Sequence, residues 1–486
     1  MNTLRELNTN YIDGVWRAGL SGQIYENRDP YTGDVVSSIT LADARDIDAA
    51  YKAAARAQKE WVGMGPWEQS RILENAITVI EKYENNGELS DLIAAELGGN
   101  RLKAGFETFL TKNIIKEAAT YPQRMDGYIL PGTIPGKENR LYRIPVGVVG
   151  VISPSNFPLF LTMKMVVAAL GAGNGVVLKP NENTYISGGL FLAKVFEEAG
   201  LPPGLLNVVV TTVELMGDSF IAHDIVSAIA FTGSSAAGSQ IAALAGKHLK
   251  DVALELGGNS AFIVLDDADI DYAVNAAVFS RFTHQGQICM CGNRILVANS
   301  VYDEFVEKFV KKVKTLKAGD PRNEDTIIGP LITERQTRAL LATVDAAVEQ
   351  GAEVLYRGEV RGNVVEPIVL AGSNALACAR EEMFGPAVVI VRFEDDEDAI
   401  TIANDTKYGL SGAVHTANLE RGAELAKRIE TGMIHINDTT INDEPLIAFG
   451  GEKHSGVGRF NGRWALEKFT TLKWISVQHT KRVFPY

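Results

Sequence analysis

The sequence predicts an α/β protein with two successive domains, each built on a mostly parallel sheet that helices cover on both faces. From residue 146 onward, short runs of β-branched residues alternate with helix-like stretches, a pattern typical of strand–helix–strand units. A second alternation of the same kind begins near residue 260. The chain has 486 residues, of which 46% are hydrophobic, and single hydrophobic cores stop growing at roughly 250–300 residues. Two or more domains are therefore expected.

The first alternation predicts the first sheet. Its expected strands are short apolar runs rich in valine and isoleucine, at 146–152, 176–179, 206–210 and 225–231. Its expected helices are the longer stretches between and after them, at 159–170, 186–200 and 235–246. Parallel strands joined by helices are buried on both faces, so their sequences are expected to be almost continuously apolar.

The second alternation predicts the second sheet. Its expected strands are AFIVL, RILVA, AVVIVRF, LSGAVHT and GMIHIN, at 261–265, 294–298, 387–393, 410–416 and 432–437. Helix-like segments such as 300–317 separate them. No fixed-period repeat and no long Pro/Gly/Ser linker interrupts the chain.

Residues 127–145, GYILPGTIPGKENRLYRIP, interrupt the first domain with proline and glycine and predict a projecting hairpin arm. The aromatic, strand-like tail at 470–486 is expected to pair with it, and such an arm usually packs on a partner subunit. We therefore divide the chain into a first domain (1–126 and 146–256), a second domain (257–455), and an oligomerisation arm and tail (127–145 and 456–486).

Composition narrows the class of function. Three cysteines cannot form a disulfide framework, and the charged start MNTLRELNTNYIDG lacks an apolar signal core. Both observations favour a cytoplasmic protein. The longest apolar runs stop at about ten residues, well short of the roughly 20 that cross a bilayer. A net charge of −13 argues against a nucleic-acid binder and favours small-molecule chemistry.

A candidate phosphate site follows the strand expected at 225–231. There Gly233 leads into a helix with Ser234 in its first turn and Gly238 five positions after Gly233, which places helix N-terminal amides where a pyrophosphate could bind. The spacing is not GxGxxG, so a plain tight turn remains an alternative. The glycines of 171–175 precede a strand and are rejected as a phosphate loop.

Two charged residues mark the same edge of the expected sheet. Lys179 ends the strand at 176–179, and Glu182 follows three residues later. Ligands of open α/β sheets bind beyond the carboxyl ends of the strands, so both side chains are candidates for ligand contacts.

The segment FTHQGQICMCGNR, residues 282–294, holds Cys289 and Cys291 with His284 upstream. A zinc site would need a second Cys or His pair at metal spacing, which is missing, and we expect no metal. A redox pair would more often be C-x-x-C. From spacing alone, a buried structural cysteine is the commonest role, and Cys378 is assigned to that class.

Several motifs together resemble the aldehyde dehydrogenase superfamily. LELGGNS (254–260) and GQICMCGNR (286–294) are similar to the family's glutamate and cysteine signatures, and further matches follow in the family's order over nearly the whole chain. They are SPSNFP (153–158), GNGVVLKPNE (173–182), FTGSSAAG (231–238), EEMFGP (381–386) and AFGGEKHSGVGR (448–459).

The chain departs from the family pattern at three positions. Ser155 stands where many members have Trp, Cys291 where a small residue is common, and Ala448 where Pro is common. The segment 435–451, HINDTTINDEPLIAFGG, most resembles the branch that oxidises aromatic aldehydes such as benzaldehyde and vanillin.

The resemblance implies a Rossmann-like NAD-binding domain, a catalytic domain and three catalytic residues. Cys289 would be the nucleophile, because an aldehyde releases hydride only after something has added to its carbonyl carbon. The side-chain amide of Asn156 and the Cys289 backbone N–H would hold the resulting oxyanion. Glu255 would take a proton from the water that hydrolyses the thioester.

The resemblance also implies the cofactor residues. Lys179 and Glu182 would bind the adenosine ribose hydroxyls, Ser234 between Gly233 and Gly238 the pyrophosphate, and Glu382 the nicotinamide ribose with Phe384 beside it. NAD is expected to be preferred, with NADP possible, because a 2′-phosphate would meet the like charge of Glu182.

The resemblance further implies a small-molecule aldehyde as substrate and a homodimer or homotetramer, with no nucleic-acid or membrane partner. Two alternatives remain: oxidation of an aliphatic aldehyde or semialdehyde, and a non-catalytic structural or binding homologue. The presence of Cys289, Glu255 and Asn156 argues against the second alternative.

Overall fold

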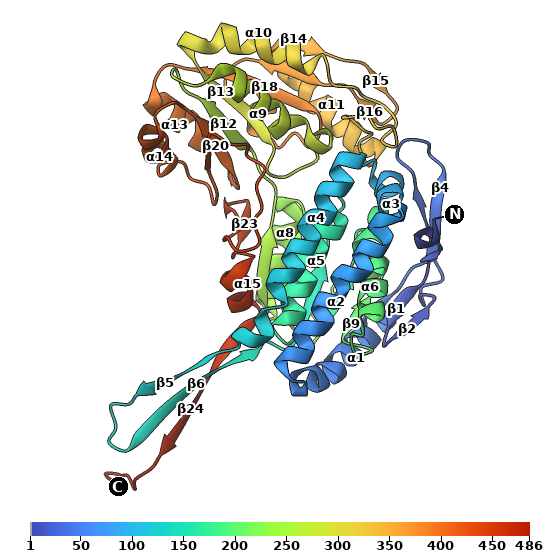
Figure 1. The fold of residues 1–486 in the computed structure, drawn as a ribbon, viewed down its shortest axis with the longest axis vertical. Helices are drawn as coiled ribbons and strands as arrows, with labels where there is room; N and C mark the ends of the chain where they lie inside the picture. The colour runs from blue at the N-terminus through green and yellow to red at the C-terminus, as the bar shows by residue number, and fades with distance from the viewer. Residues whose placement is uncertain (1) are drawn as a thin grey trace.

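The computed structural model describes residues 2–486 and shows two stacked α/β domains with a long β arm that projects from the lower one (Figure 1). The predicted α/β class is confirmed. Each sheet is mostly parallel and lies between two layers of helices.

The first domain is built on an eight-stranded sheet with the order β2-β1-β9-β8-β7-β10-β11-β23. Its five central strands are parallel, whereas three short outer strands are joined to the sheet by antiparallel pairing. The central strands are β9 (Leu206–Val208), β8 (Gly175–Lys179), β7 (Val148–Ile152), β10 (Val226–Thr232) and β11 (Asp251–Glu255), and the edge strands are β1 (Asn10–Ile12), β2 (Val15–Arg17) and β23 (Gly456–Val457).

Helices cover both faces of this sheet because its strands alternate apolar side chains between them. Val149 and Val151 of β7 pack into one core, and Val148 and Ile152 pack into the other. The first core lies under α2 (Pro66–Asn85), α3 (Glu88–Leu97), α4 (Arg101–Ala118), α5 (Pro158–Gly171), α6 (Phe191–Ala199) and α15 (Gly462–Lys468); the second lies under α1 (Ala44–Gly63), α7 (Val213–Met216) and α8 (Ser235–Lys247).

The second domain is built on a seven-stranded sheet with the order β14-β17-β18-β13-β12-β20-β21, parallel except for the edge pair β14–β17. Its strands are β12 (Ser260–Val264), β13 (Gly292–Ala298), β14 (Glu353–Arg357), β17 (Ile368–Ala371), β18 (Ala387–Phe393), β20 (Gly412–His415) and β21 (His435–Ile436). Its helices are α9 (Ile270–Phe282), α10 (Tyr302–Val313), α11 (Glu334–Glu349), α12 (Ala377–Arg380), α13 (Asp396–Asn404) and α14 (Leu419–Ala426).

The arm is a three-stranded antiparallel sheet that extends away from both domains (Figure 1). The predicted pairing of hairpin and tail is confirmed: β6 (Lys137–Pro145) pairs with β5 (Gly127–Pro131) and with β24 (Thr470–Gln478). Three two-stranded sheets complete the fold: β3 (Ile24–Arg28) with β4 (Val35–Thr40), β15 (Val360–Arg361) with β16 (Val364–Val365), and β19 (Tyr408–Gly409) with β22 (Glu452–Lys453).

The segment at 456–468 lies elsewhere than the sequence-based division places it. That division assigns it to the tail, but β23 pairs with β11 of the first sheet, and α15 packs on α5. Only the strand from residue 470 onward joins the arm. The difference arises because β23 is two residues long and carries no recognisable strand pattern.

The carboxyl ends of β7, β8, β10 and β11 meet at the edge of the first sheet that faces the second domain, since parallel strands end at one side. This edge carries the segment 153–157, Lys179, Gly233 and Glu255.

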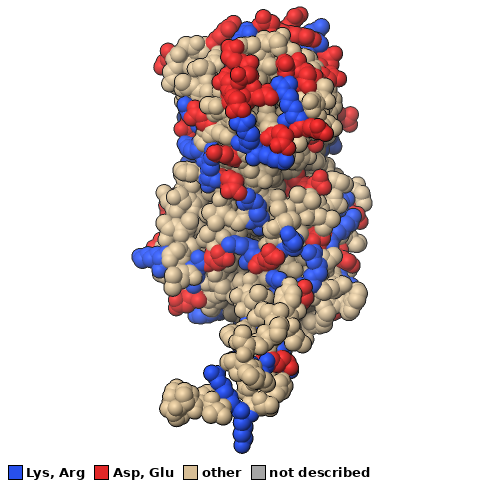
Figure 2. Space-filling view, turned by 90° about the vertical axis from the view of Figure 1, so that its left-hand side faces the viewer, with Lys and Arg blue, Asp and Glu red and all other residues tan. Residues whose placement is uncertain are grey.

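Acidic and basic side chains are interspersed over the upper domain, whereas much of the arm is uncharged (Figure 2). Within residues 2–486, no helix is both long and apolar enough to cross a membrane.

Candidate active site

Two cavities meet at Cys289 and Asn156. The first has a volume of about 490 Å³ and is lined by residues of both domains. The second is apolar and is lined mainly by aromatic and aliphatic side chains. Cys289 and Asn156 line both cavities, so a molecule in either one reaches the cysteine.

Cys289 lies in the turn that joins α9 to β13 of the second sheet. The turn is strained, since His284 and Gln285 have φ values of 50° and 43°. It also packs closely on the connection between β11 and β12: a Cβ added to Gly258 would lie 2.2 Å from the Cys289 carbonyl oxygen. Only glycine at position 258 allows this approach.

The two cysteines of this turn differ in their surroundings. Cys289 is partly exposed and faces the cavities, whereas Cys291 is buried with its thiol 3.7 Å from the Arg281 carbonyl oxygen. Burial raises the pKa of the Cys289 thiol well above its usual value, and the carboxylates of Glu382 and Glu255 add to this effect. The thiol is therefore protonated until a positive charge approaches it.

Asn156 follows β7 and is buried. Its Nδ2 donates a hydrogen bond of 3.0 Å to the carbonyl oxygen of Gln287, two residues before Cys289. An amide nitrogen carries two hydrogens, so one remains for a ligand in the cavity. Within residues 2–486 the Cys289 backbone N–H donates no hydrogen bond, which leaves a second donor beside it.

Glu255 ends β11 and is buried beside a lysine that the sequence analysis did not single out. Lys164 Nζ lies 3.0 Å from Glu255 Oε1 and 3.0 Å from Asp443 Oδ2, and all three side chains are at most 4% exposed. Burial raises the pKa of Glu255; Lys164 opposes this rise and Asp443 adds to it. Burial alone would lower the pKa of Lys164, but Asp443 and Glu255 raise it, so the lysine is charged.

Lys179 and Glu182 lie together in the 490 Å³ cavity, joined by an ion pair of 2.9 Å. Gly233 and Ser234 line the same cavity at the start of α8, where Ser234 Oγ accepts the Ala237 N–H at 3.3 Å as helix N-cap. The N–H groups of the first helical turn have no intrahelical acceptor, and those of Ser235 and Ala236 remain for a ligand.

Glu382 and Phe384 also line this cavity. Glu382 Oε1 accepts the backbone N–H of Gly258 at 3.1 Å, and burial raises the pKa of this carboxyl to about 7. Six of the seven sequence-predicted cofactor residues thus lie in one cavity.

Gly238 is the exception, because it does not line the cavity. A Cβ added there would lie 2.4 Å from a Leu256 methyl carbon, so this glycine allows α8 to pack closely on the chain after β11. The structure therefore supports a packing role for Gly238.

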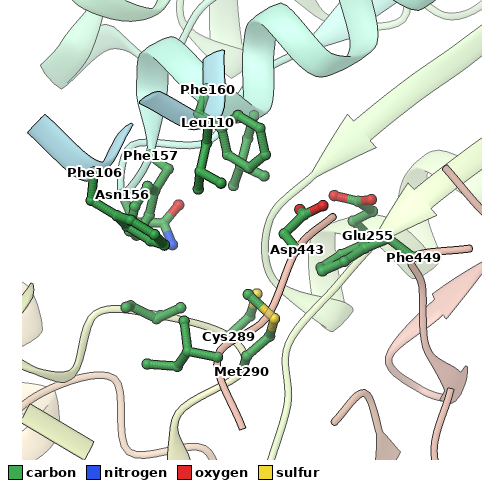
Figure 3. Close-up of a pocket in the computed structure, with 13 residues that line it drawn as sticks. Phe106, Leu110, Asn156, Phe157, Phe160, Glu255, Cys289, Met290, Asp443 and Phe449 are labelled. Atoms are coloured by element: carbon green, nitrogen blue, oxygen red, sulfur yellow. The ribbon is translucent and has the colours of Figure 1, made fainter. Parts of the chain in front are cut away.

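The apolar cavity is formed by the two domains together (Figure 3). In Figure 3, Asn156 and Glu255 lie on opposite sides of the space that Cys289 faces, with Asp443 next to Glu255. The remaining walls come from α4, α5, the turn of Cys289 and the segment before β22: Phe106, Leu110, Phe157, Phe160, Leu161, Ile288, Met290, Ile441 and Phe449.

Sequence reasoning missed Lys164, Asp443 and Arg335, the last of which lines the larger cavity. A lysine within the otherwise apolar run LFLTMKMVVAAL is the one signal that could have pointed to Lys164, because a buried lysine needs an anionic partner. His284, five residues before Cys289, is buried, with its ring 5.5 Å from that of Phe157. Among residues 2–486, no cluster of three His, Cys, Asp or Glu side chains could hold a metal ion.

Comparisons with known proteins agree with this geometry. Residues 16–475 match the profile of the aldehyde dehydrogenase family. Benzaldehyde dehydrogenase YfmT of Bacillus subtilis is 61% identical over 482 residues, 99% of each chain. A vanillin dehydrogenase of Corynebacterium glutamicum is 45% identical, over 96% of this chain and 97% of its own length. The crystal structure of an NAD-dependent benzaldehyde dehydrogenase from C. glutamicum has a TM-score of 0.90 at 41% identity, covering 98% of this chain and 97% of that one.

Proposed function

This chain belongs to the aldehyde dehydrogenase family, and we propose that it oxidises aromatic aldehydes of the benzaldehyde and vanillin type to carboxylic acids, with NAD as the preferred cofactor. The observation that carries this proposal is the place of Cys289 between an aromatic-lined cavity and a cavity with dinucleotide-binding groups. Relatives named for benzaldehyde and vanillin support the substrate class.

Cys289 and Asn156 suit the first half of the reaction. The Cys289 sulfur adds to the carbonyl carbon, and the carbonyl oxygen becomes an oxyanion that needs donors already in place. The free hydrogen of the Asn156 amide and the Cys289 N–H are these donors. Collapse of the oxyanion expels the former aldehyde hydrogen as hydride, which a bound nicotinamide would accept, and leaves a thioester on Cys289.

NAD fits the groups that line the larger cavity. Lys179 and Glu182 present a donor and an acceptor to ribose hydroxyls, the free N–H groups at the start of α8 suit a pyrophosphate, and Glu382 accepts from a second ribose. When bound, the nicotinamide supplies the acceptor for the hydride and a positive charge near Cys289. Glu182 favours NAD over NADP because its carboxylate would repel a 2′-phosphate.

Glu255, Lys164 and Asp443 suit the second half of the reaction, in which water hydrolyses the thioester. Glu255 takes a proton from the water that attacks the thioester, which requires the ionised carboxylate. Lys164 stabilises this ionised form in a buried site, and Asp443 on its other side holds the lysine in place.

The lining of the apolar cavity favours a neutral aromatic substrate over a semialdehyde that carries a carboxylate. Phe106, Phe157, Phe160 and Phe449 can contact a ring by stacked or edge-on packing. Among the described residues that line this cavity there is no Arg or Lys, and the charged ones are Glu255 and Asp443. A distal carboxylate would therefore lack a cationic partner and meet like charge.

The exposed apolar side chains of the arm support assembly with a second copy of the chain, as a homodimer or homotetramer. Its apolar side chains are unusually exposed for a soluble surface: Tyr128, Ile129, Leu130, Tyr142, Leu472, Trp474 and Ile475 are each more than 40% exposed.

A substrate panel tests the proposed function. Benzaldehyde, vanillin, hexanal and succinic semialdehyde are assayed with NAD and with NADP, and kcat/KM is compared. We expect the two aromatic aldehydes with NAD to give the highest values and succinic semialdehyde the lowest. A preference for hexanal or succinic semialdehyde would contradict the aromatic assignment, and no turnover of any aldehyde would favour a non-catalytic role.

A further inference from the structure

Glu107 of α4 is a buried carboxylate that the proposed chemistry does not use. Its side chain is 0% exposed and forms an ion pair with Lys103, one helical turn earlier and 1% exposed. Glu107 Oε1 also accepts two backbone N–H groups of α5, from Leu159 at 2.9 Å and from Phe160 at 3.1 Å. One side chain thus joins α4 to the start of α5.

These two hydrogen bonds provide acceptors for the backbone N–H groups of the first turn of α5 that otherwise have none. Helix N-terminal N–H groups need an outside acceptor, and Phe157, at the N-cap position, provides no side-chain cap. Pro158 has no N–H, and Leu161 already donates to the Phe157 carbonyl oxygen at 2.9 Å. The N–H groups of Leu159 and Phe160 are the two that remain. Because every residue of α5 is buried, water is a poor substitute for Glu107.

The start of α5 is also the support of Asn156. This residue precedes Phe157 directly, and its amide must reach both Gln287 and the space above Cys289. Lys103 Nζ lies 4.6 Å from the centre of the Phe157 ring, and the His284 ring lies 5.5 Å from the same ring, edge-on. The Lys103–Glu107 pair therefore contacts both the helix start and the loop that carries the amide.

We propose that Glu107 is a positioning residue for the oxyanion site: by capping the first turn of α5 it aims the Asn156 amide at the carbonyl oxygen of an aldehyde held by Cys289. This inference rests on the proposed function for the role of Asn156. A carboxylate suits the place because the N-terminal end of a helix attracts negative charge and Lys103 needs a buried partner.

Two variants separate the effect of the length of the Glu107 side chain from the effect of its charge. Glu107→Asp keeps the charge for Lys103 but withdraws the carboxylate by one methylene from the N–H groups of α5. The double variant Lys103→Met, Glu107→Gln keeps the reach and the acceptor oxygen and removes both charges together. If Glu107 positions Asn156 by capping α5, Glu107→Asp no longer positions the amide, whereas the double variant still does.

The readout is the rate constant of the first turnover, measured as the burst of NADH formation with benzaldehyde in stopped flow. We expect Glu107→Asp to lower this rate constant at least tenfold, with the KM for NAD changed less than twofold. The double variant is expected to stay within threefold of the parent. A hydrogen-bond donor misplaced by a fraction of an ångström stabilises the transition state less. The burst rate constant therefore falls, whereas the KM for NAD changes little.

Glu96→Asp is the matched control. Glu96 of α3 is likewise 0% exposed and caps N–H groups of another helix start, those of Ile186 and Ser187 at 3.1 and 2.8 Å, but it lines neither cavity. Its variant is expected to lower the thermal midpoint of unfolding while the burst rate stays within twofold of the parent.

A parent-like burst in folded Glu107→Asp would overturn the inference, and so would an equal slowing in Glu96→Asp at the same loss of thermal midpoint. A double variant that is as slow as Glu107→Asp would also overturn it. If the parent oxidises hexanal and not benzaldehyde, the aromatic assignment fails alone, and the same comparison is made with hexanal.

Discussion

Cys289 and Cys291 are two residues apart, yet only one of them can meet a substrate. Cys289 lines both cavities, whereas Cys291 is 3% exposed and directs its thiol to a backbone carbonyl. At the residue scale, chemistry in this protein is decided by which neighbours a side chain has. The same holds for Glu255, whose charge state depends on Lys164 and Asp443.

We predict that Cys289→Ala abolishes aldehyde oxidation and that Cys291→Ala keeps most of it. Removing the nucleophile eliminates the thioester route, whereas the second substitution removes one buried sulfur and costs stability of about 1–2 kcal/mol. Steady-state kcat and a thermal melt of both variants check this. Equal loss of activity in two folded variants would contradict the assignment of Cys289.

We predict that Asp443→Asn moves the acid limb of the kcat–pH profile to lower pH, by roughly half a pH unit or more. Asp443 raises the pKa of Glu255, so its removal lowers that pKa and leaves the base ionised further into acid. The profile is measured under conditions where thioester hydrolysis limits turnover. Glu444→Gln, at the exposed neighbouring carboxylate, is the control and should leave the limb in place; an unmoved limb in Asp443→Asn would refute the coupling.

We predict that Glu182→Ser raises kcat/KM for NADP relative to NAD at least tenfold, about 1.4 kcal/mol. The substitution removes the carboxylate that would repel a 2′-phosphate and leaves Lys179, now unpaired, to bind it. The ratio is compared in parent and variant with one aldehyde. An unchanged ratio, or a parent that already favours NADP, would show that Glu182 does not select the cofactor.

At the scale of elements, the site depends on short connections that hold the two sheets together. The segment 256–259 joins β11, which carries Glu255, to β12 of the second sheet, and it packs directly against the turn of Cys289. Its Gly258 also donates to Glu382. One connection therefore sets the positions of Cys289, Glu255 and Glu382 relative to one another.

We predict that Gly258→Ala lowers kcat/KM at least tenfold. The new methyl group would lie 2.2 Å from the Cys289 carbonyl oxygen, so the turn must shift, and small misplacements of reacting groups are costly to rate. Gly246→Ala in α8, where nothing lies within 4 Å, is the control; it should keep activity and gain about 0.5–1 kcal/mol of stability. Parent-like kinetics in Gly258→Ala would show that the close packing is dispensable.

At the scale of the whole molecule, residues of both domains line the two cavities, and the arm lies apart from them. The arm contributes no residue to either cavity at Cys289. It projects from the first domain with an exposed apolar surface (Figure 1). A second copy of the chain is the partner that we propose for that surface.

We predict that light scattering at micromolar concentration gives a mass of two or four chains of 52.6 kDa each. Ile129→Lys places a charge on the arm at a position that is 76% exposed in the single chain, and it should shift the mass toward the monomer because a buried charge is costly. Ile24→Lys on β3, 72% exposed, is the control and should not. A parent mass of one chain would contradict the assembly.

Much of the fold and most of the candidate site could be predicted from local sequence. Apolar runs such as 146–152 specify buried parallel strands wherever they lie, and turns after them need glycine or capping residues at fixed places. Cys289, Glu255, Asn156 and six candidate cofactor residues were therefore predictable from motifs of contiguous residues, and the structure places them at the two cavities.

Only the tertiary structure decided which residues from distant segments contact one another. Asp443 lies 279 residues from Lys164, and Glu107 lies 52 and 53 residues from the N–H groups that it caps. No local pattern encodes such pairs, because each depends on how packed elements orient a side chain. The strand β23 and the packing role of Gly238 were missed for the same reason. Sequence by itself determined which chemical groups this protein has; burial and contact across the fold decided which are charged, which are reactive and which hold the others in place.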